Sequence, residues 1–102
     1  MMTSVDTDLI RVLADPLRLQ IVTLIAKEML CTTHLVEETG ARQTNLSNHL
    51  RVLREAGVVD TEPCGRFTYY RLKSDVLASL AGQFADLAES ARNAAENKRA
   101  CP

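Results

Sequence analysis

The sequence has no long apolar run, although 46% of its 102 residues are hydrophobic. A helix that crosses a membrane needs roughly 20 consecutive apolar residues, so the pattern excludes a transmembrane segment. The apolar content is nevertheless too high for a disordered chain. Linkers, internal repeats and low-complexity tracts are also absent from the sequence. At this length we therefore expect one domain, residues 1–102, with one core.

Cysteine is scarce and odd in number. The chain has three cysteines, and an odd count argues against a framework of disulfides. The first eight residues carry two acids and no base, so they do not resemble a signal peptide. Together these features predict reduced thiols and a cytoplasmic location.

An overall excess of positive charge is missing too. The formal net charge is −1, which taken alone speaks against nucleic-acid binding. The charge is unevenly distributed, however: residues 1–41 carry three bases and six acids, residues 42–73 six bases and three acids, and residues 74–102 three bases and four acids. A basic stretch of this kind is expected where a protein contacts DNA phosphates. On charge alone, a solvated surface explains the clustering equally well.

Two helices are predicted at the start of the chain. Apolar residues within 9–13 give a short amphipathic helix that ends near Ala14. Asp15 followed by Pro16 is an N-cap and first-turn pair, which predicts a second helix. The apolar spacing carries this helix to about Lys27.

Two more helices follow before residue 57. Thr32 or Thr33 is expected to cap a third helix that stops at Gly40. A fourth is predicted over Gln43–Ala56, with Gly57 after its last turn. Its expected buried face is formed by Leu46, Leu50 and Leu53.

The pattern then changes to β structure. Residues 58–72 contain two β-like runs separated by turn residues, which predicts a hairpin with Arg66 at its tip. A last helix over about 75–96 carries a wide stripe of alanine, leucine and phenylalanine, and residues 97–102 form a flexible tail. The predicted order is α-α-α-α-β-β-α.

A helix-turn-helix is predicted over about 33–56, with a tight turn at 40–42. The second helix has a polar face opposite its leucines, and its side chains are of the types that bond base edges and phosphates. The expected DNA-binding residues are Gln43, Thr44, Asn45, Ser47, Asn48, His49, Arg51 and Arg66. A polar helix face usually means only exposure to solvent. The coincidence of the turn, the hairpin and the basic middle third favours DNA binding.

Three segments resemble the ArsR/SmtB family of metal-sensing repressors. They are Leu13–Leu19, Gln43–Arg54 followed by Gly57, and Gly65–Leu72, within about 60 of the 102 residues. The resemblance implies a mainly α fold with a β-hairpin wing, a winged helix-turn-helix. It also implies a homodimer that occupies operator DNA without effector and leaves it when the effector binds. The apolar stripe of the last helix and the small core independently favour a dimer.

The resemblance extends to a sensor motif before the third helix. Cys31 stands at the first of two cysteines that arsenic and cadmium repressors of the family carry, Thr33 stands at the second, and His34 at an aspartate. The missing thiol means that further ligands must come from elsewhere. Cys64 in the hairpin turn and Cys101 in the tail are the candidates, and the tail could fold back or reach the other subunit.

Three thiolates suit a soft, trigonal ion. The predicted effector is As(III) or Sb(III), with Cd(II) or Pb(II) as the alternative. The family's zinc or nickel site on the last helix uses histidines, and residues 75–102 contain none, so a sensor of that type is disfavoured. A thiol-redox switch is a further hypothesis, because a helix N-terminus favours the Cys31 thiolate. His34 is expected to cap the helix or face solvent.

An enzyme is not predicted. Asp86 with Glu89 could form a carboxylate pair, and Cys31 with His34 could imitate a nucleophile and its base. Neither pair comes with an oxyanion device or a third orienting group. A dimerisation module without DNA binding is a separate hypothesis, which salt-dependent binding to DNA would exclude.

Overall fold

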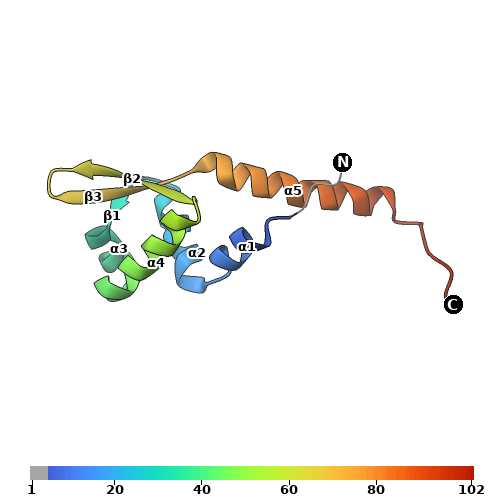
Figure 1. Ribbon diagram of the computed structural model, residues 1–102, viewed down its shortest axis with the longest axis horizontal. Helices are drawn as coiled ribbons and strands as arrows, with labels where there is room; N and C mark the ends of the chain where they lie inside the picture. The colour runs from blue at the N-terminus through green and yellow to red at the C-terminus, as the bar shows by residue number, and fades with distance from the viewer. Residues whose placement is uncertain (1–4) are drawn as a thin grey trace.

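The computed structural model describes residues 5–102 as five helices and a three-stranded antiparallel sheet (Figure 1). The helices are α1 (Thr7–Leu13), α2 (Pro16–Ile25), α3 (Thr32–Thr39), α4 (Gln43–Glu55) and α5 (Ser74–Asn93). The strands are β1 (Leu30–Cys31), β2 (Val59–Cys64) and β3 (Phe67–Leu72). This confirms the winged helix-turn-helix fold. The prediction about residues 1–8 falls partly outside the described residues.

The predicted helix signals lie where the helices begin and end. Asp15 caps α2, and its Oδ1 accepts the backbone N–H of Leu17 at 2.9 Å and of Arg18 at 3.0 Å. Gly40 has φ 73° directly after α3, and Gly57 has φ 79° after α4. These left-handed conformations are open to glycine without a steric cost, which explains the two helix ends.

The sequence-based order of elements was incomplete, because β1 was not expected. β1 pairs with β3 in the register Leu30 with Tyr70 and Cys31 with Tyr69, and the sheet order is β1-β3-β2. A strand of two residues has no periodicity that a sequence pattern could reveal. The pairing ties the hairpin directly to the start of α3.

The expected cap of α3 was also wrong by one or two residues. The N-cap is Cys31, and Thr32 is already the first helical residue. Strand β1 ends at Cys31 and α3 begins at the next residue, which fixes this boundary. The backbone N–H of Cys31 donates to Nδ1 of His34 at 3.1 Å, so His34 has the capping role expected for it.

The core lies between helices α1 to α4 and the sheet. Its buried members are Leu9, Ile21, Val22, Ile25, Leu30, Leu35, Leu46, Leu50, Leu53, Val58 and Val59. The three leucines of α4 are fully buried. Their burial turns the opposite, polar face of that helix toward solvent.

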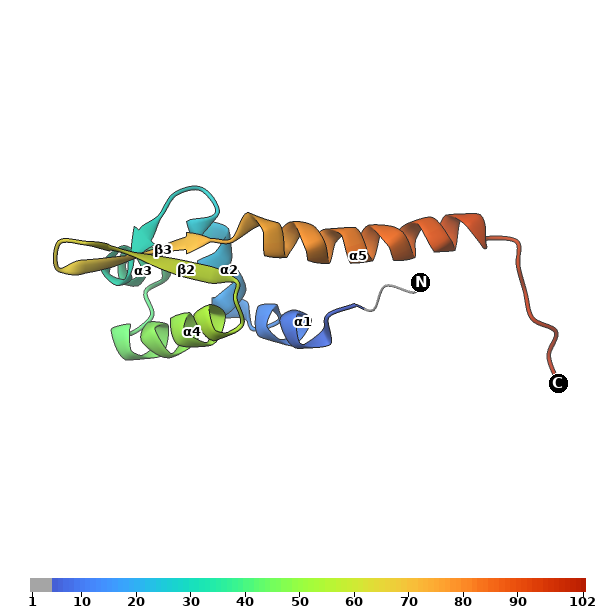
Figure 2. The same ribbon diagram turned by 45° about the horizontal axis from the view of Figure 1, so that its top comes forward.

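Helix α5 leaves the rest of the fold along the long axis of a molecule that measures 63 × 23 × 21 Å (Figures 1 and 2). Val76, Leu77 and Leu80 pack against the core, whereas Phe84 and Leu87 further along are 48% and 52% exposed. The structure describes all of α5 and finds no buried residue in it. Within residues 5–102, no helix has the length and apolarity needed to cross a membrane.

Candidate nucleic-acid interface and thiol site

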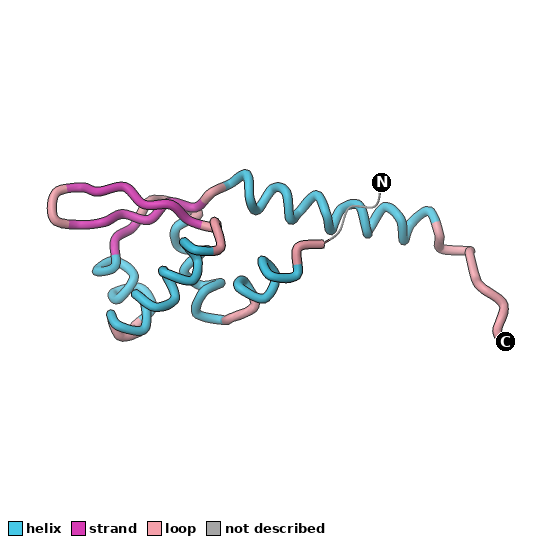
Figure 3. The backbone as a smooth tube through the Cα atoms, in the orientation of Figure 1, coloured by secondary structure: helices cyan, strands magenta, loops and turns pink. Residues whose placement is uncertain are grey.

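Helix α4 presents a continuous polar surface. The pair α3–α4, joined through Gly40, lies beneath the hairpin of β2 and β3 (Figure 3). The exposed polar residues of α4 from the predicted set are Gln43, Thr44, Asn45, Ser47, Asn48 and Arg51. They occupy the first two and a half turns, which is the part of a recognition helix that enters the major groove.

His49 differs from the rest of that set. Its side chain is half-buried, and its Nδ1 lies 3.0 Å from Nη1 of Arg18 on α2. The ring therefore faces α2 and does not join the exposed row. The pKa of the neighbouring Asp15 carboxyl is lowered below 3.8, first by the backbone N–H of Arg18 and further by the charge of the Arg18 guanidinium.

The hairpin forms an exposed wing. β2 and β3 pair from Val59 with Leu72 to Cys64 with Phe67, and Gly65 has φ 63° in the turn. Arg66 beside it is exposed at the tip, as predicted. On β3, Nε of Arg71 donates to Asp60 at 3.0 Å and Nη1 lies 3.8 Å from Glu62, so this arginine braces the hairpin from within.

The three cysteines occupy different environments, and all are free thiols. Cys31 is only 5% exposed at the end of β1, whereas Cys64 on the wing and Cys101 in the tail are exposed. Within residues 5–102 of one protomer, no group of three His, Cys, Asp or Glu side chains is placed to hold a metal ion.

The wing is nevertheless close to Cys31 within one protomer. Cys31 pairs with Tyr69, and Cys64 pairs with Phe67. The two cysteines thus lie on opposite sides of β3 and on one face of the sheet. Strand spacing and rise place their Cα atoms ~12 Å apart.

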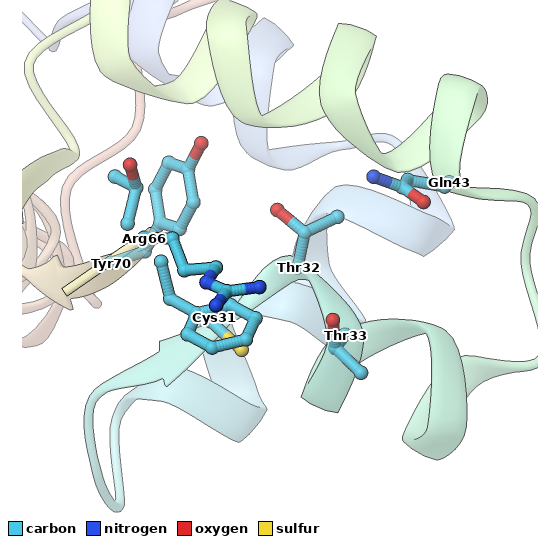
Figure 4. Close-up of a pocket in the computed structure, with 8 residues that line it drawn as sticks. Cys31, Thr32, Thr33, Gln43, Arg66 and Tyr70 are labelled. Carbon is cyan, nitrogen blue, oxygen red and sulfur yellow. The ribbon is translucent and has the colours of Figure 1, made fainter. Parts of the chain in front are cut away.

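A cleft joins Cys31 to the predicted DNA contacts. Its volume is about 320 Å³, and Figure 4 shows Arg66 reaching over the start of α3 toward Cys31. The lining residues are Cys31, Thr32, Thr33, Gln43, Arg66, Phe67, Thr68 and Tyr70. Because β1 pairs only with Tyr69 and Tyr70, it leaves the edge of β3 open at residues 67 and 68.

Sequence reasoning missed the hydroxyl groups of this cleft. Thr32, Thr68 and Tyr70 line it together with Arg66 and Gln43. The alternation in residues 67–70 predicts a strand, but only the unforeseen β1–β3 pairing brings that strand beside α3. The cleft therefore depends on an element without a signal of its own in the sequence.

The buried helical core, the exposed recognition helix and the braced hairpin define a winged helix-turn-helix regulator of the DNA-binding class. The model of the family "Bacterial regulatory protein, arsR family" matches residues 15–61. The chain belongs to the ArsR/SmtB family of transcriptional regulators. Members of this class are regulators and not enzymes, as predicted.

Individual relatives agree with this assignment. The transcriptional repressor SmtB of Mycobacterium tuberculosis is 38% identical over 73 residues, which are 72% of this chain and 54% of SmtB. The chain thus spans about half the length of that relative. A crystal structure described as a possible transcriptional regulator for arsenical resistance is 35% identical, with a TM-score of 0.71 over 90% of this chain and 98% of the other.

A more distant structure shows the fold alone. The homodimeric winged helix-turn-helix DNA-binding domain of a Mycobacterium bovis protein, solved in solution, is 24% identical. Its TM-score is 0.68, over 92% of this chain and 86% of the other.

Proposed function

We propose that the chain is a repressor that binds operator DNA as a homodimer and is released by a thiophilic ion, As(III) or Sb(III). The observation that carries the proposal is the shared cleft. Cys31, the predicted sensor thiol, lines it together with Gln43 and Arg66, two of the predicted DNA contacts. One cavity therefore adjoins both the sensing and the reading surface.

The DNA contacts follow from the exposed face of α4. Gln43, Thr44, Asn45 and Ser47 would meet base edges in the major groove, with Asn48, Arg51 and the wing's Arg66 against the backbone. A single recognition helix reads few base pairs. Two copies related by a two-fold axis would read two half-sites about one helical turn apart.

The dimer is supported by α5. The exposed Phe84 and Leu87 continue the line of Val76, Leu77 and Leu80, which already pack on the core. Exposed apolar surface of this extent on a small domain is typical of a protein interface. A second copy of α5 is the occupant that the family's homodimeric architecture implies.

The proposed ion site combines Cys31 with Cys64 and Cys101. Three thiolates match the ligand preference of As(III) and Sb(III). Cys64 shares a sheet face with Cys31, and Cys101 belongs to an exposed tail that a dimer could bring to either protomer. The similar structure described as a possible regulator for arsenical resistance supports the choice of ion.

Release follows from where the ion would bind. A ligand that draws another thiol toward Cys31 moves the start of α3 and the adjoining edge of the wing. The positions of Arg66 and Gln43 relative to each other then change, because both line the same cleft. Such coupling is reciprocal, so the ion must bind more weakly to the DNA complex than to the free protein.

The proposal is tested on DNA that the protein itself selects from a random library. Arsenite, antimonite, Cd(II) and Pb(II) are titrated into the protein–DNA complex under reducing conditions, and release is followed by fluorescence anisotropy. We expect arsenite and antimonite to release the wild type and to leave the Cys31→Ser complex intact. Thr33→Ser, beside the thiol, is the matched control and should respond as the wild type does.

The other outcomes separate the alternatives. Release by Cd(II) or Pb(II) alone would identify a sensor of those ions. Release by diamide that a thiol reductant reverses, with no response to any ion, would identify the redox switch. X-ray absorption of the arsenite-loaded protein counts the sulfur ligands, and three are expected.

A further inference from the structure

One guanidinium joins three helices of the fold. Nε of Arg18 on α2 donates to the backbone carbonyl of Val12 on α1 at 2.6 Å. Nη1 of the same side chain lies 3.0 Å from Nδ1 of His49 on α4. The backbone N–H of Arg18 is itself held by Asp15 at 3.0 Å. Arg18 thus connects the end of α1, the first turn of α2 and the recognition helix.

The chemistry of the contact fixes the state of the imidazole. A guanidinium has only donors, so Nδ1 of His49 must be the acceptor and the ring proton must lie on Nε2. Both groups are planar, which makes the hydrogen bond sensitive to rotation of either partner. Both side chains are half-buried, so bulk water competes for the contact less than at an exposed site.

The other contacts that hold α4 on its buried face are apolar and, unlike the hydrogen bond to His49, have no preferred direction. Leu46, Leu50 and Leu53 hold the helix through apolar burial, which depends on area and is tolerant of small rotations. The bond from Arg18 to His49 is the polar contact between α2 and the recognition helix. It can therefore set the rotation of α4 about its own axis, and with it the direction of the exposed side chains.

A second hydrogen bond extends this connection toward α5. The backbone N–H of Asp6, the N-cap residue of α1, donates to Oε1 of Gln83 on α5 at 2.9 Å. Helix α1 is therefore tied to α5 at its start and to Arg18 near its end.

We propose that Arg18 and His49 are positioning residues for operator recognition. Arg18, anchored on Val12, holds His49 and so fixes the rotational setting of α4 against the α1–α2 corner. His49 acts on DNA through this setting and not through contact with a base or phosphate. The inference rests on the proposed DNA-binding function and adds Arg18, which lies outside the helix-turn-helix, to the residues that determine specificity.

Four variants test the assignment. His49→Leu and Arg18→Met keep the bulk of each side chain and remove the hydrogen bond, whereas His49→Asn keeps an acceptor near the position of Nδ1. We expect each of the first two to weaken binding to the selected DNA about tenfold, and the double variant to lose no more than either single one. His49→Asn should stay within about twofold of the wild type.

Two further readouts on DNA distinguish positioning from direct DNA contact. Affinity for random DNA and the slope of affinity against salt should be unchanged in all four variants, because no phosphate contact is removed. The variants that lose the hydrogen bond should melt a few degrees lower, so binding is measured well below the melting temperatures. Equal losses on selected and random DNA would overturn the proposal. So would additive losses in the double variant, or a His49→Asn protein as weak as His49→Leu.

The contact is also tested without DNA. Nitrogen NMR of the imidazole in the free wild type should show the proton of His49 on Nε2, with a changed signal in Arg18→Met. A proton on Nδ1 would overturn the assignment. A wild type that binds no DNA, with the expected NMR result, would instead reject the proposed function and leave the Arg18–His49 contact established.

Discussion

At the scale of single residues, Asp15 caps the start of α2 and thereby makes the stability of the fold depend on pH. Its carboxylate accepts two backbone N–H groups at the start of α2 and has a pKa below 3.8. The lowered pKa means that the charged cap contributes stability above the pKa of the unfolded chain. That contribution is lost as the pH falls through the lower pKa of the folded protein.

We therefore predict a pH-dependent effect of Asp15→Asn. An asparagine keeps a cap oxygen but carries no charge, so the variant should melt a few degrees below the wild type near neutral pH. The gap should close in the acid range, below about pH 4, as the wild-type carboxylate takes up a proton. Circular dichroism melts across this range measure it, and a gap that is constant with pH would contradict the prediction.

Gly40 permits a second prediction at this scale. This residue lies between α3 and α4 with φ 73°, and a Cβ placed there would meet no atom within 4 Å. The cost of a side chain is therefore conformational and not steric. Gly40→Ala should lower the free energy of unfolding by about 1–2 kcal/mol, measured in urea. Gly40→Asn should lose clearly less, because asparagine tolerates the left-handed region, and equal losses would point to another cause.

Residue patterns predicted local features well and contacts between distant residues poorly. The roles of Asp15, Gly40 and Gly57 depend on the backbone next to each residue, so the local sequence predicts them. Arg18 and His49 are 31 residues apart, and nothing in the intervening spacing signals that they meet. The capping role of Cys31 was missed because the end of β1 determines it.

At the scale of elements, the two faces of α4 have different roles: the buried face contributes to folding, and the exposed face is the one proposed to contact DNA. Its leucines are buried and its polar residues are exposed. Asn45→Ala and Ser47→Ala should each weaken binding to selected DNA about tenfold, in line with the loss of a base or phosphate contact, and should leave the melting temperature unchanged. Gln20→Ala, exposed on α2, is the control. Unchanged affinity of both α4 variants in a shift assay would count against the assigned face.

The predicted elements were correct wherever periodicity or turn chemistry defined them. The helix-turn-helix, the hairpin and the long last helix all fall within a few residues of their expected bounds. Strand β1 was missed because two residues cannot show a period. The cleft and the nearness of Cys64 to Cys31 were missed with it, since both follow from the pairing of β1 with β3.

At the scale of the whole molecule, α5 carries exposed apolar side chains that the proposed dimer would cover. Phe84→Ser with Leu87→Ser should raise the dissociation constant of the proposed dimer on the order of a hundredfold or more, because each protomer loses two apolar side chains from the interface. Sedimentation equilibrium measures this change. Leu19→Ser, on α2 and similarly exposed at 51%, is the matched control. A dimer unaffected by the α5 pair would show that its interface lies elsewhere.

The exposure of α5 also bears on how long an individual chain survives. A helix without buried side chains depends on its own marginal stability beyond the part that rests on the core, so in a lone protomer its outer half frays and becomes a substrate for proteases. In the proposed homodimer, pairing would protect that half. Because the unpaired fraction of a homodimer falls as its concentration rises, cleavage of the outer half of α5 would be fastest in dilute protein.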